Sequence, residues 1–282
     1  MNEKNIAVLG AGSWGIAMAN LLAGNGCKVS MWEFDRKVCV ALQESRELPS
    51  KLPGIKIDET ISITSELSQS VSSAEFVFCA VPAQFLRSAL SGSDLSASRK
   101  RPVYVNLAKG IEVGSLKRMS QVIAEKISSD KRSGISTLSG PSHAEEVARG
   151  IPTAVTVASE NIEMAERVQG LFLTSNFRVY TTSDLVGVEL AGSLKNVIAL
   201  AAGMLDGLEL GDNTRGALIT RGLAEMVRLG VKMGADPMTF SGLDSDVRRS
   251  QNFACPIPSS QRDTRITIPL SFRASFPCSI AF

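Results

Sequence analysis

The chain begins with glycines at a spacing that suits a dinucleotide phosphate. Residues 10–15 read Gly10-Ala11-Gly12-Ser13-Trp14-Gly15. Gly10 allows a sharp turn off a strand, Gly12 lets bare backbone approach a pyrophosphate, and Gly15 lets the next helix pack closely on that strand. An apolar run precedes the motif and a small-residue helical pattern follows it. The sequence therefore predicts a dinucleotide held by free N–H groups at a helix start.

Lys195 is the candidate for proton transfer. It is the only charged residue in the apolar helical pattern Leu190–Leu205. Burial lowers the pKa of a lysine toward the range in which it accepts a proton, so a buried Lys195 can act as a general base. The alternative is a lysine that reaches solvent along its stem. Small neighbouring residues favour close packing around Lys195 and hence the functional interpretation.

Two further segments suit an anion because each follows an apolar run that reads as a strand. One is Asn106–Gly110, which contains Lys109, and the other is Ser139-Gly140-Pro141-Ser142, which precedes a helical pattern. Ligands of open α/β sheets bind outside the carboxyl ends of the strands, where Lys109 and these free N–H groups and hydroxyls would lie. A solvated lysine is the alternative for Lys109.

The second predicted strand, Val29–Trp32, is followed by residues that bear on cofactor choice. Glu33 or Asp35 could accept a hydrogen bond from a ribose 2′-hydroxyl, whereas Arg36 could take a 2′-phosphate. NAD and NADP are therefore both open at this point. A solvated loop of mixed charge is the alternative.

Two polar features favour structural roles. His143 is the only histidine, and no carboxylate is placed by the sequence to orient it, so we expect a packing or surface role. The polar segment Gly211–Arg215 precedes a long helical pattern, for which Asp212 or Asn213 would be the N-cap.

These groups need an alternation of strands and helices to position them. Continuous apolar runs between residues 1 and 182 predict strands covered on both faces, in a Rossmann-like, doubly wound α/β sheet. The predicted strands are Ile6–Leu9, Val29–Trp32, Phe76–Val81, Val103–Leu107, Ser136–Leu138, Thr153–Ala158 and Arg178–Tyr180. The intervening polar stretch Ser65–Ser73 is expected to be helical at its centre and exposed. An all-helical second domain, itself incomplete, is expected over 183–242.

Composition narrows the class of protein. The 282 residues are 44% hydrophobic, with 30 basic and 28 acidic residues, which gives no broad case for binding nucleic acid or a membrane surface. No apolar run looks long enough to span a bilayer. Five cysteines without CxxC spacing suggest neither a disulfide framework nor a metal site and fit a reducing cytoplasm.

The segment 243–282 departs from the rest of the chain. It contains no Gly, Lys or Glu, although 23 glycines precede it, and it has seven serines, five arginines and four prolines. One interpretation is a surface tail. The other is a segment that is out of frame with the sequence for which the fold was selected.

Taken together, the motifs closely resemble bacterial NAD(P)-dependent glycerol-3-phosphate dehydrogenases from residue 1 to about 243. The shared motifs are Gly10–Gly15, Ala108-Lys109-Gly110-Ile111-Glu112, Ser139–Ala144, Lys195-Asn196-Val197 and Ala217–Glu225. The resemblance implies reversible reduction of dihydroxyacetone phosphate to sn-glycerol 3-phosphate, a precursor of phospholipids. The segment after Leu243 departs from the family pattern, which implies a shortened or frame-shifted member.

The resemblance also implies roles for individual residues. Lys195 matches the catalytic lysine, which also touches substrate. The implied cofactor-binding residues are Gly10, Gly12, Ser13, Trp14, Gly15, Phe34, Lys109 and Ala144. The implied substrate-binding residues are Lys109, Gly140, Ser142 and Lys195. Phe34 stands where the family often has histidine or arginine, which weakens the case for NADP.

Three functional hypotheses follow. The first is an active dehydrogenase that binds NAD or NADP and a small phosphate substrate, in the cytoplasm and as a possible homodimer. The second is a catalytically inactive, truncated homologue that binds nucleotide. The third, another lysine-using hydroxyacid dehydrogenase, fits the complete set of motifs less well.

Overall fold

The computed structural model describes residues 3–91, 100–172 and 174–241. The strands are β1 Asn5–Leu9, β2 Lys28–Trp32, β3 Ser62–Thr64, β4 Phe76–Cys79, β5 Val103–Asn106, β6 Gly134–Ser139, β7 Thr153–Ala158 and β8 Phe177–Thr182. The helices are α1 Ser13–Gly24, α2 Arg36–Ser45, α3 Leu67–Val71, α4 Ala83–Ser91, α5 Met119–Lys126, α6 Ala144–Ala148, α7 Ile162–Gln169, α8 Leu185–Gly207 and α9 Gly211–Lys232, followed by the 3₁₀ turn η2 Pro237–Ser241.

The strands form one eight-stranded sheet in the order β3-β2-β1-β4-β5-β6-β7-β8. Every pairing is parallel except that of β6 with β7, which is antiparallel. The chain leaves β1 toward β2 on one side and later returns to β4 on the other, so β1 lies where the strand order reverses. This is the crevice position at which open α/β sheets bind ligands.

Helices cover both faces of this sheet, and successive residues of β1 show how. Ile6 and Val8 point into an apolar core shared with α1, α2, α6 and α7, whereas Ala7 and Leu9 point into a second core shared with α3, α4 and α5. The period of two along a strand and the burial of both faces explain why β1 reads as a continuous apolar run. The predicted doubly wound sheet is confirmed.

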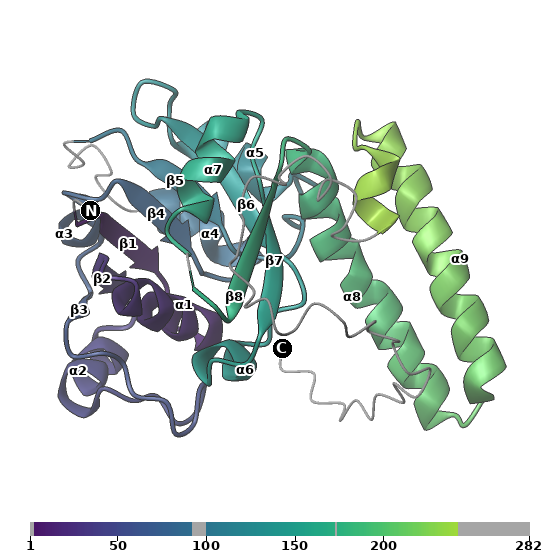
Figure 1. Ribbon diagram of the computed structural model, residues 1–282, viewed down its shortest axis with the longest axis horizontal. Coiled ribbons are helices and arrows are strands. Elements are labelled where there is room, and N and C mark those ends of the chain that lie inside the picture. Colours follow the sequence, from purple (N-terminus) through teal and green to yellow (C-terminus); the bar gives the residue numbers. More distant parts are fainter. Residues whose placement is uncertain (1–2, 92–99, 173, 242–282) are drawn as a thin grey trace, which may run out of the picture.

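The two longest described helices, α8 and α9, lie side by side at the β6–β8 end of the sheet (Figure 1). Asp184 ties this region together: it caps α8 by accepting from the Gly187 N–H at 2.8 Å, and it accepts from the Asp236 N–H at 3.0 Å and the Thr239 hydroxyl at 2.6 Å. The predicted helical region after the sheet is thereby confirmed for the residues described.

The structure corrects three local predictions. β3 was not predicted, because a three-residue edge strand with two polar residues carries little apolar signal. The segment Ser65–Ser73 is helical at its centre, as expected, but it is exposed only in part: Glu66, Gln69 and Ser73 are exposed, whereas Leu67, Ser70 and Val71 are buried. Neither Asp212 nor Asn213 caps α9: the helix already begins at Gly211.

The expectation that no apolar run could span a bilayer was wrong on length. α8 has 23 residues and contains an 18-residue window with a mean hydropathy of 1.5, which suffices by length and composition. Its first half, however, packs on β6 and β7 and buries the ion-paired Glu189. We therefore interpret α8 as a helix that packs against the sheet.

The tail 243–282, with its two alternative interpretations, lies outside the described residues.

Candidate active site

The glycine turn between β1 and α1 has the geometry that its sequence predicted. Gly10 has φ +108°, in the region that favours glycine. A Cβ on Gly15 would collide with the Gly10 carbonyl oxygen, so only glycine allows this close approach of helix and strand. A Cβ on Gly12 would meet no atom within 4 Å, so the backbone there borders open space.

Free N–H groups face this turn from the start of α1. The first helical bond in α1 runs from the Ile16 N–H to the Gly12 carbonyl, and no side chain caps the helix. The preceding N–H groups are thus unsatisfied within the helix and suit a phosphate. Open space at Gly12 and uncapped donors together fit a dinucleotide pyrophosphate. The Ser13 hydroxyl is already occupied, since it donates to the Lys51 carbonyl at 2.6 Å.

The structure separates the roles of the charged residues after β2. The Glu33 carboxylate accepts from the Ala11 N–H at 3.3 Å, so it lies beside the glycine turn. Asp35 instead caps α2 by accepting from the Lys37 N–H at 2.8 Å. Arg36 pairs with Glu66 at 2.8 Å on the surface. Of the three, Glu33 has the geometry for a ribose contact.

The side chains of Phe34 and Trp14 differ in how far they are exposed to solvent. Phe34 is 81% exposed and makes an edge-to-face contact with Trp32 at 6.2 Å between ring centroids. Trp14 is half-buried against the core beneath α1. An exposed ring at the end of β2 is free to stack on a planar ligand, which Trp14 is less able to do.

Lys109 and Lys195, 86 positions apart in the chain, converge on one oxygen. Each Nζ donates a hydrogen bond to the Gly140 carbonyl at 3.3 Å. Lys109 follows β5 and Gly140 follows β6, while Lys195 reaches them from α8. The two lysines make no ion pair with any carboxylate of the described residues. Two ammonium groups with one neutral acceptor leave unbalanced positive charge that favours an anion.

The environment lowers the pKa of both lysines. Burial, and then the charge of Lys195, lower the pKa of Lys109 to about 8, although part of its side chain is exposed to solvent. Burial also lowers the pKa of Lys195, which is half-buried. Weaker hydration of an ammonium favours its neutral form, so each group is closer to proton exchange at physiological pH than a surface lysine.

Only glycine fits at position 140. Its φ is +156°, and a Cβ would lie 2.9 Å from the Cα of Val155 on the neighbouring strand. The Ser142 hydroxyl also donates to the Gly140 carbonyl, at 3.4 Å. Ala144 begins α6 and is buried in the same core as the glycine turn, and α6 packs on α1. The predicted anion segment therefore lies close to the predicted cofactor segment.

His143 is exposed and is the N-cap of α6, without a side-chain capping bond. This agrees with a surface role.

Sequence reasoning missed Gly192, Asn106 and Glu189. A Cβ on Gly192 would lie 2.7 Å from the Ser139 hydroxyl, so glycine lets α8 approach the end of β6. Asn106 and Glu189 are buried and hydrogen-bonded behind the lysines. Glycine among small residues of α8 was a usable signal, whereas the two polar residues gave none.

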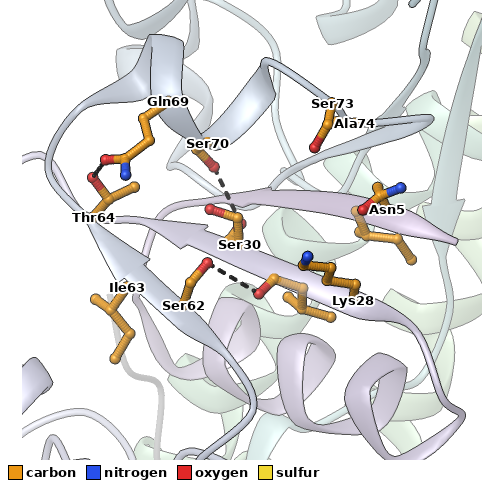
Figure 2. A pocket seen from close by; sticks show the side chains of 12 residues that line it. Asn5, Lys28, Ser30, Ser62, Ile63, Thr64, Gln69, Ser70, Ser73 and Ala74 are labelled. Atoms are coloured by element: carbon orange, nitrogen blue, oxygen red, sulfur yellow. Dashed lines mark hydrogen bonds between the residues drawn. The ribbon is translucent and has the colours of Figure 1, made fainter. Parts of the chain in front are cut away.

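A cavity of about 220 Å³ between α3 and the β1–β3 strands is not part of this site (Figure 2). It includes the first residues of β1 and β2, Asn5 and Lys28, whereas the lysine pair lies beyond the carboxyl ends of β5 and β6. Ser62 and Ser70 donate to strand carbonyls there (Figure 2). We interpret the cavity as a packing feature.

Comparisons with known proteins agree with this geometry. Residues 5–165 match the family model for the NAD-dependent glycerol-3-phosphate dehydrogenase N-terminus, and residues 184–245 match that for its C-terminus. The chain is 47% identical to "Glycerol-3-phosphate dehydrogenase [NAD(P)+]" of Bacillus subtilis (strain 168) over 240 residues, which are 85% of this chain and 69% of that protein. It is 49% identical to the protein of the same name from Geobacter sp. (strain M21), over 86% of this chain and 72% of the relative.

Solved structures give the same result. The crystal structure of glycerol-3-phosphate dehydrogenase from Coxiella burnetii superposes with a TM-score of 0.79 at 35% identity, covering 86% of this chain and 73% of that one. The Saccharomyces cerevisiae enzyme superposes with a TM-score of 0.71 at 26% identity, over 84% and 73% of the two chains. By sequence and by structure, this chain belongs to the NAD-dependent glycerol-3-phosphate dehydrogenase family.

Proposed function

We propose that this protein interconverts dihydroxyacetone phosphate and sn-glycerol 3-phosphate, with NAD or NADP as the hydride carrier. The observation that carries the proposal is the convergence of Lys109 and Lys195 on the Gly140 carbonyl. These groups lie at the carboxyl edge of a sheet whose first turn is a dinucleotide cradle. The product supplies glycerol phosphate for phospholipid synthesis.

The cofactor is held by the turn after β1. Gly10, Gly12 and Gly15 shape the turn, and the N–H groups of Ser13 and Trp14 face the pyrophosphate. Glu33 would accept a hydrogen bond from the ribose, and the exposed Phe34 ring would be available to stack on the base. Lys109 and Ala144 complete the cofactor contacts next to the substrate. A bound nicotinamide supplies or accepts the hydride.

The substrate is held by positive charge and small residues. Lys109 attracts the phosphate, and the hydrogen bonds of both lysines to the Gly140 carbonyl support a position in which Lys109 and Lys195 face the same space. Gly140 and Ser142 supply the rest of the substrate pocket. Because both lysines lack a carboxylate partner among the described residues, a dianion gains from both charges.

Lys195 moves the proton. In the reducing direction its ammonium donates a proton to the carbonyl oxygen of dihydroxyacetone phosphate as the carbonyl carbon accepts the hydride. In the oxidising direction its neutral amine accepts the proton of the secondary hydroxyl. Burial lowers the pKa of Lys195, which brings its neutral amine closer to neutral pH than that of a surface lysine.

The division of the chain is part of the proposal. We infer a dinucleotide-binding domain over 1–182, a helical substrate domain over 183–242 and an atypical tail over 243–282. The end of β8 at Thr182 and the start of α8 at Leu185 support the first boundary. We further propose that the protein is cytoplasmic and forms a homodimer. Light scattering of the purified protein tests the dimer.

The direct test is oxidation of NADH and of NADPH by the purified protein with dihydroxyacetone phosphate. Substrate-dependent turnover that Lys195→Ala abolishes is the expected result, and the faster cofactor establishes the preference. Absence of turnover from folded wild-type protein would contradict the proposal and favour the inactive nucleotide-binding alternative.

A further inference from the structure

A buried carboxylate lies behind the lysine pair. Glu189, in the first half of α8, is 5% exposed. It accepts hydrogen bonds from four residues outside α8. These are Arg118 Nη1 at 2.6 Å, the Ser120 N–H at 2.8 Å and hydroxyl at 2.6 Å, Thr137 Oγ1 at 3.1 Å and Asn106 Nδ2 at 3.5 Å.

Each segment that contributes a residue to the lysine site also contributes, a few positions earlier in the chain, a residue to the hydrogen-bonded cluster around Glu189. The three tied pairs are Asn106 and Lys109 at the end of β5, Thr137 and Gly140 at the end of β6, and Glu189 and Lys195 on α8. The first two pairs are three residues apart. The third is six residues apart, less than two helical turns. One carboxylate therefore links the three segments that bring the two ammonium groups to one carbonyl.

Asn106 transmits this restraint directly to the residue before Lys109. Its Oδ1 accepts from the Ala108 N–H at 2.9 Å, and its Nδ2 donates to the Ala108 carbonyl at 3.1 Å. Both backbone groups of Ala108 are thus held by one side chain. Asn106 is itself 1% exposed, so it has little room to turn.

α8 lies close against β6 between the carboxylate and the catalytic candidate. A Cβ on Gly192 would lie 2.7 Å from the Ser139 hydroxyl and 3.9 Å from Lys109 Cγ. α8 therefore cannot move closer to β6 at Gly192, and a shift of Glu189 would displace Lys195 on the same helix.

We propose that Glu189 is a positioning residue that, with Asn106 and Thr137, fixes how Lys109 and Lys195 face each other across the Gly140 carbonyl. The inference rests on the proposed function because it takes those lysines as the working groups. A carboxylate suits the position because it only accepts, whereas each of its neighbours donates. Glutamine would turn an N–H₂ group against one of these donors and leave Arg118 without its ion pair.

The first test compares Glu189→Gln with Glu75→Gln. Glu75 pairs with Lys4 and Lys100 near the amino ends of β1 and β4, at the opposite edge of the sheet, so it is a matched loss of an ion-paired carboxylate. We expect kcat to fall at least about tenfold in Glu189→Gln, with KM for the cofactor unchanged within about twofold, because the reacting groups are misplaced while the glycine turn is not. Glu75→Gln should keep the wild-type kcat.

The second test needs no turnover. An amine-reactive label, applied across a pH series and read by peptide mass spectrometry, reports the midpoint at which Lys195 becomes reactive. We expect this midpoint to rise by about half a pH unit or more in Glu189→Gln, because a displaced Lys195 regains solvent. If Glu189→Gln does not fold, Thr137→Val, which removes one hydroxyl from the cluster, is read in the same two assays.

The outcomes separate the two proposals. A folded variant that only melts at a lower temperature, with wild-type kcat and labelling midpoint, overturns the positioning role. Wild-type protein without turnover overturns the proposed function, while the labelling midpoint still decides whether Glu189 positions Lys195.

Discussion

Replacing Lys109 with Met should stabilise the unliganded protein even though it removes a proposed binding residue. The two 3.3 Å bonds to one oxygen place the ammonium nitrogens within about 6.6 Å of each other. At about 6.6 Å two unit charges repel by about 2.5 kcal/mol at an effective dielectric constant of about 20, and by about 0.6 kcal/mol in water. Because Lys109 is partly open to solvent, we expect screening to reduce the gain in unfolding free energy to about 1 kcal/mol.

The gain should depend on pH in a defined direction. The pKa of Lys109 is lowered from 10.5 to about 8 in the folded protein, so protonation favours the unfolded chain. The destabilisation by Lys109 is complete below the folded value of about 8 and fades as the pH rises through 10.5, above which neither the folded nor the unfolded state carries the charge. Lys109→Met should therefore raise Tm by about 2–4 °C at pH 7, and by progressively less toward pH 10.5.

The assay is thermal unfolding followed by circular dichroism in a buffer free of phosphate. Lys131→Met, at an exposed turn, is the control and should leave Tm nearly unchanged. Inorganic phosphate should raise the Tm of the wild type and have less effect on Lys109→Met. A Tm that is unchanged or lower in Lys109→Met at pH 7, or a gain that persists at pH 10.5, would refute the reasoning.

Three further predictions concern ligands. Gly15→Ala should raise the dissociation constant of NADH at least about tenfold by fluorescence titration, because its Cβ collides with the first glycine of the turn; Gly24→Ala, whose Cβ meets no atom within 4 Å, should not. KM for dihydroxyacetone phosphate should rise between pH 7 and 9, because Lys109 loses its charge above about 8, and a flat profile would exclude Lys109 from phosphate binding. Phe34→Arg should shift the kcat/KM ratio toward NADPH about tenfold or more; an unchanged ratio would place the cofactor's ribose elsewhere.

The sequence predicted those features that depend on neighbours along the chain. The glycine turn, the apolar strands and the Lys195 helix all follow from local spacing. β3 escaped prediction because Ser62–Thr64 is too short to show a period. The N-cap of α9 was predicted wrongly because the polar residues after Gly211 look like capping residues, whereas the helix begins before them, at Gly211.

The polar cluster behind the lysines could not be predicted for a different reason. Glu189 meets Thr137 and Asn106 across 52 and 83 residues. No local pattern marks such partners, and a glutamate in the first turns of a helix reads as solvated. Likewise, the convergence of Lys109 and Lys195 on Gly140 depends on the strand order and on how closely α8 approaches β6.

The central claim is that Lys195 transfers the proton, and chemical rescue tests it most directly. Lys195→Ala should lose at least about 10²-fold in kcat for NADH oxidation with dihydroxyacetone phosphate while still binding NADH. Small primary amines added to this variant should restore part of the rate, with a pH dependence set by the pKa of each amine. A Lys195→Ala enzyme that keeps its rate within about threefold, or whose lost rate no amine restores although NADH and substrate still bind, would contradict the account.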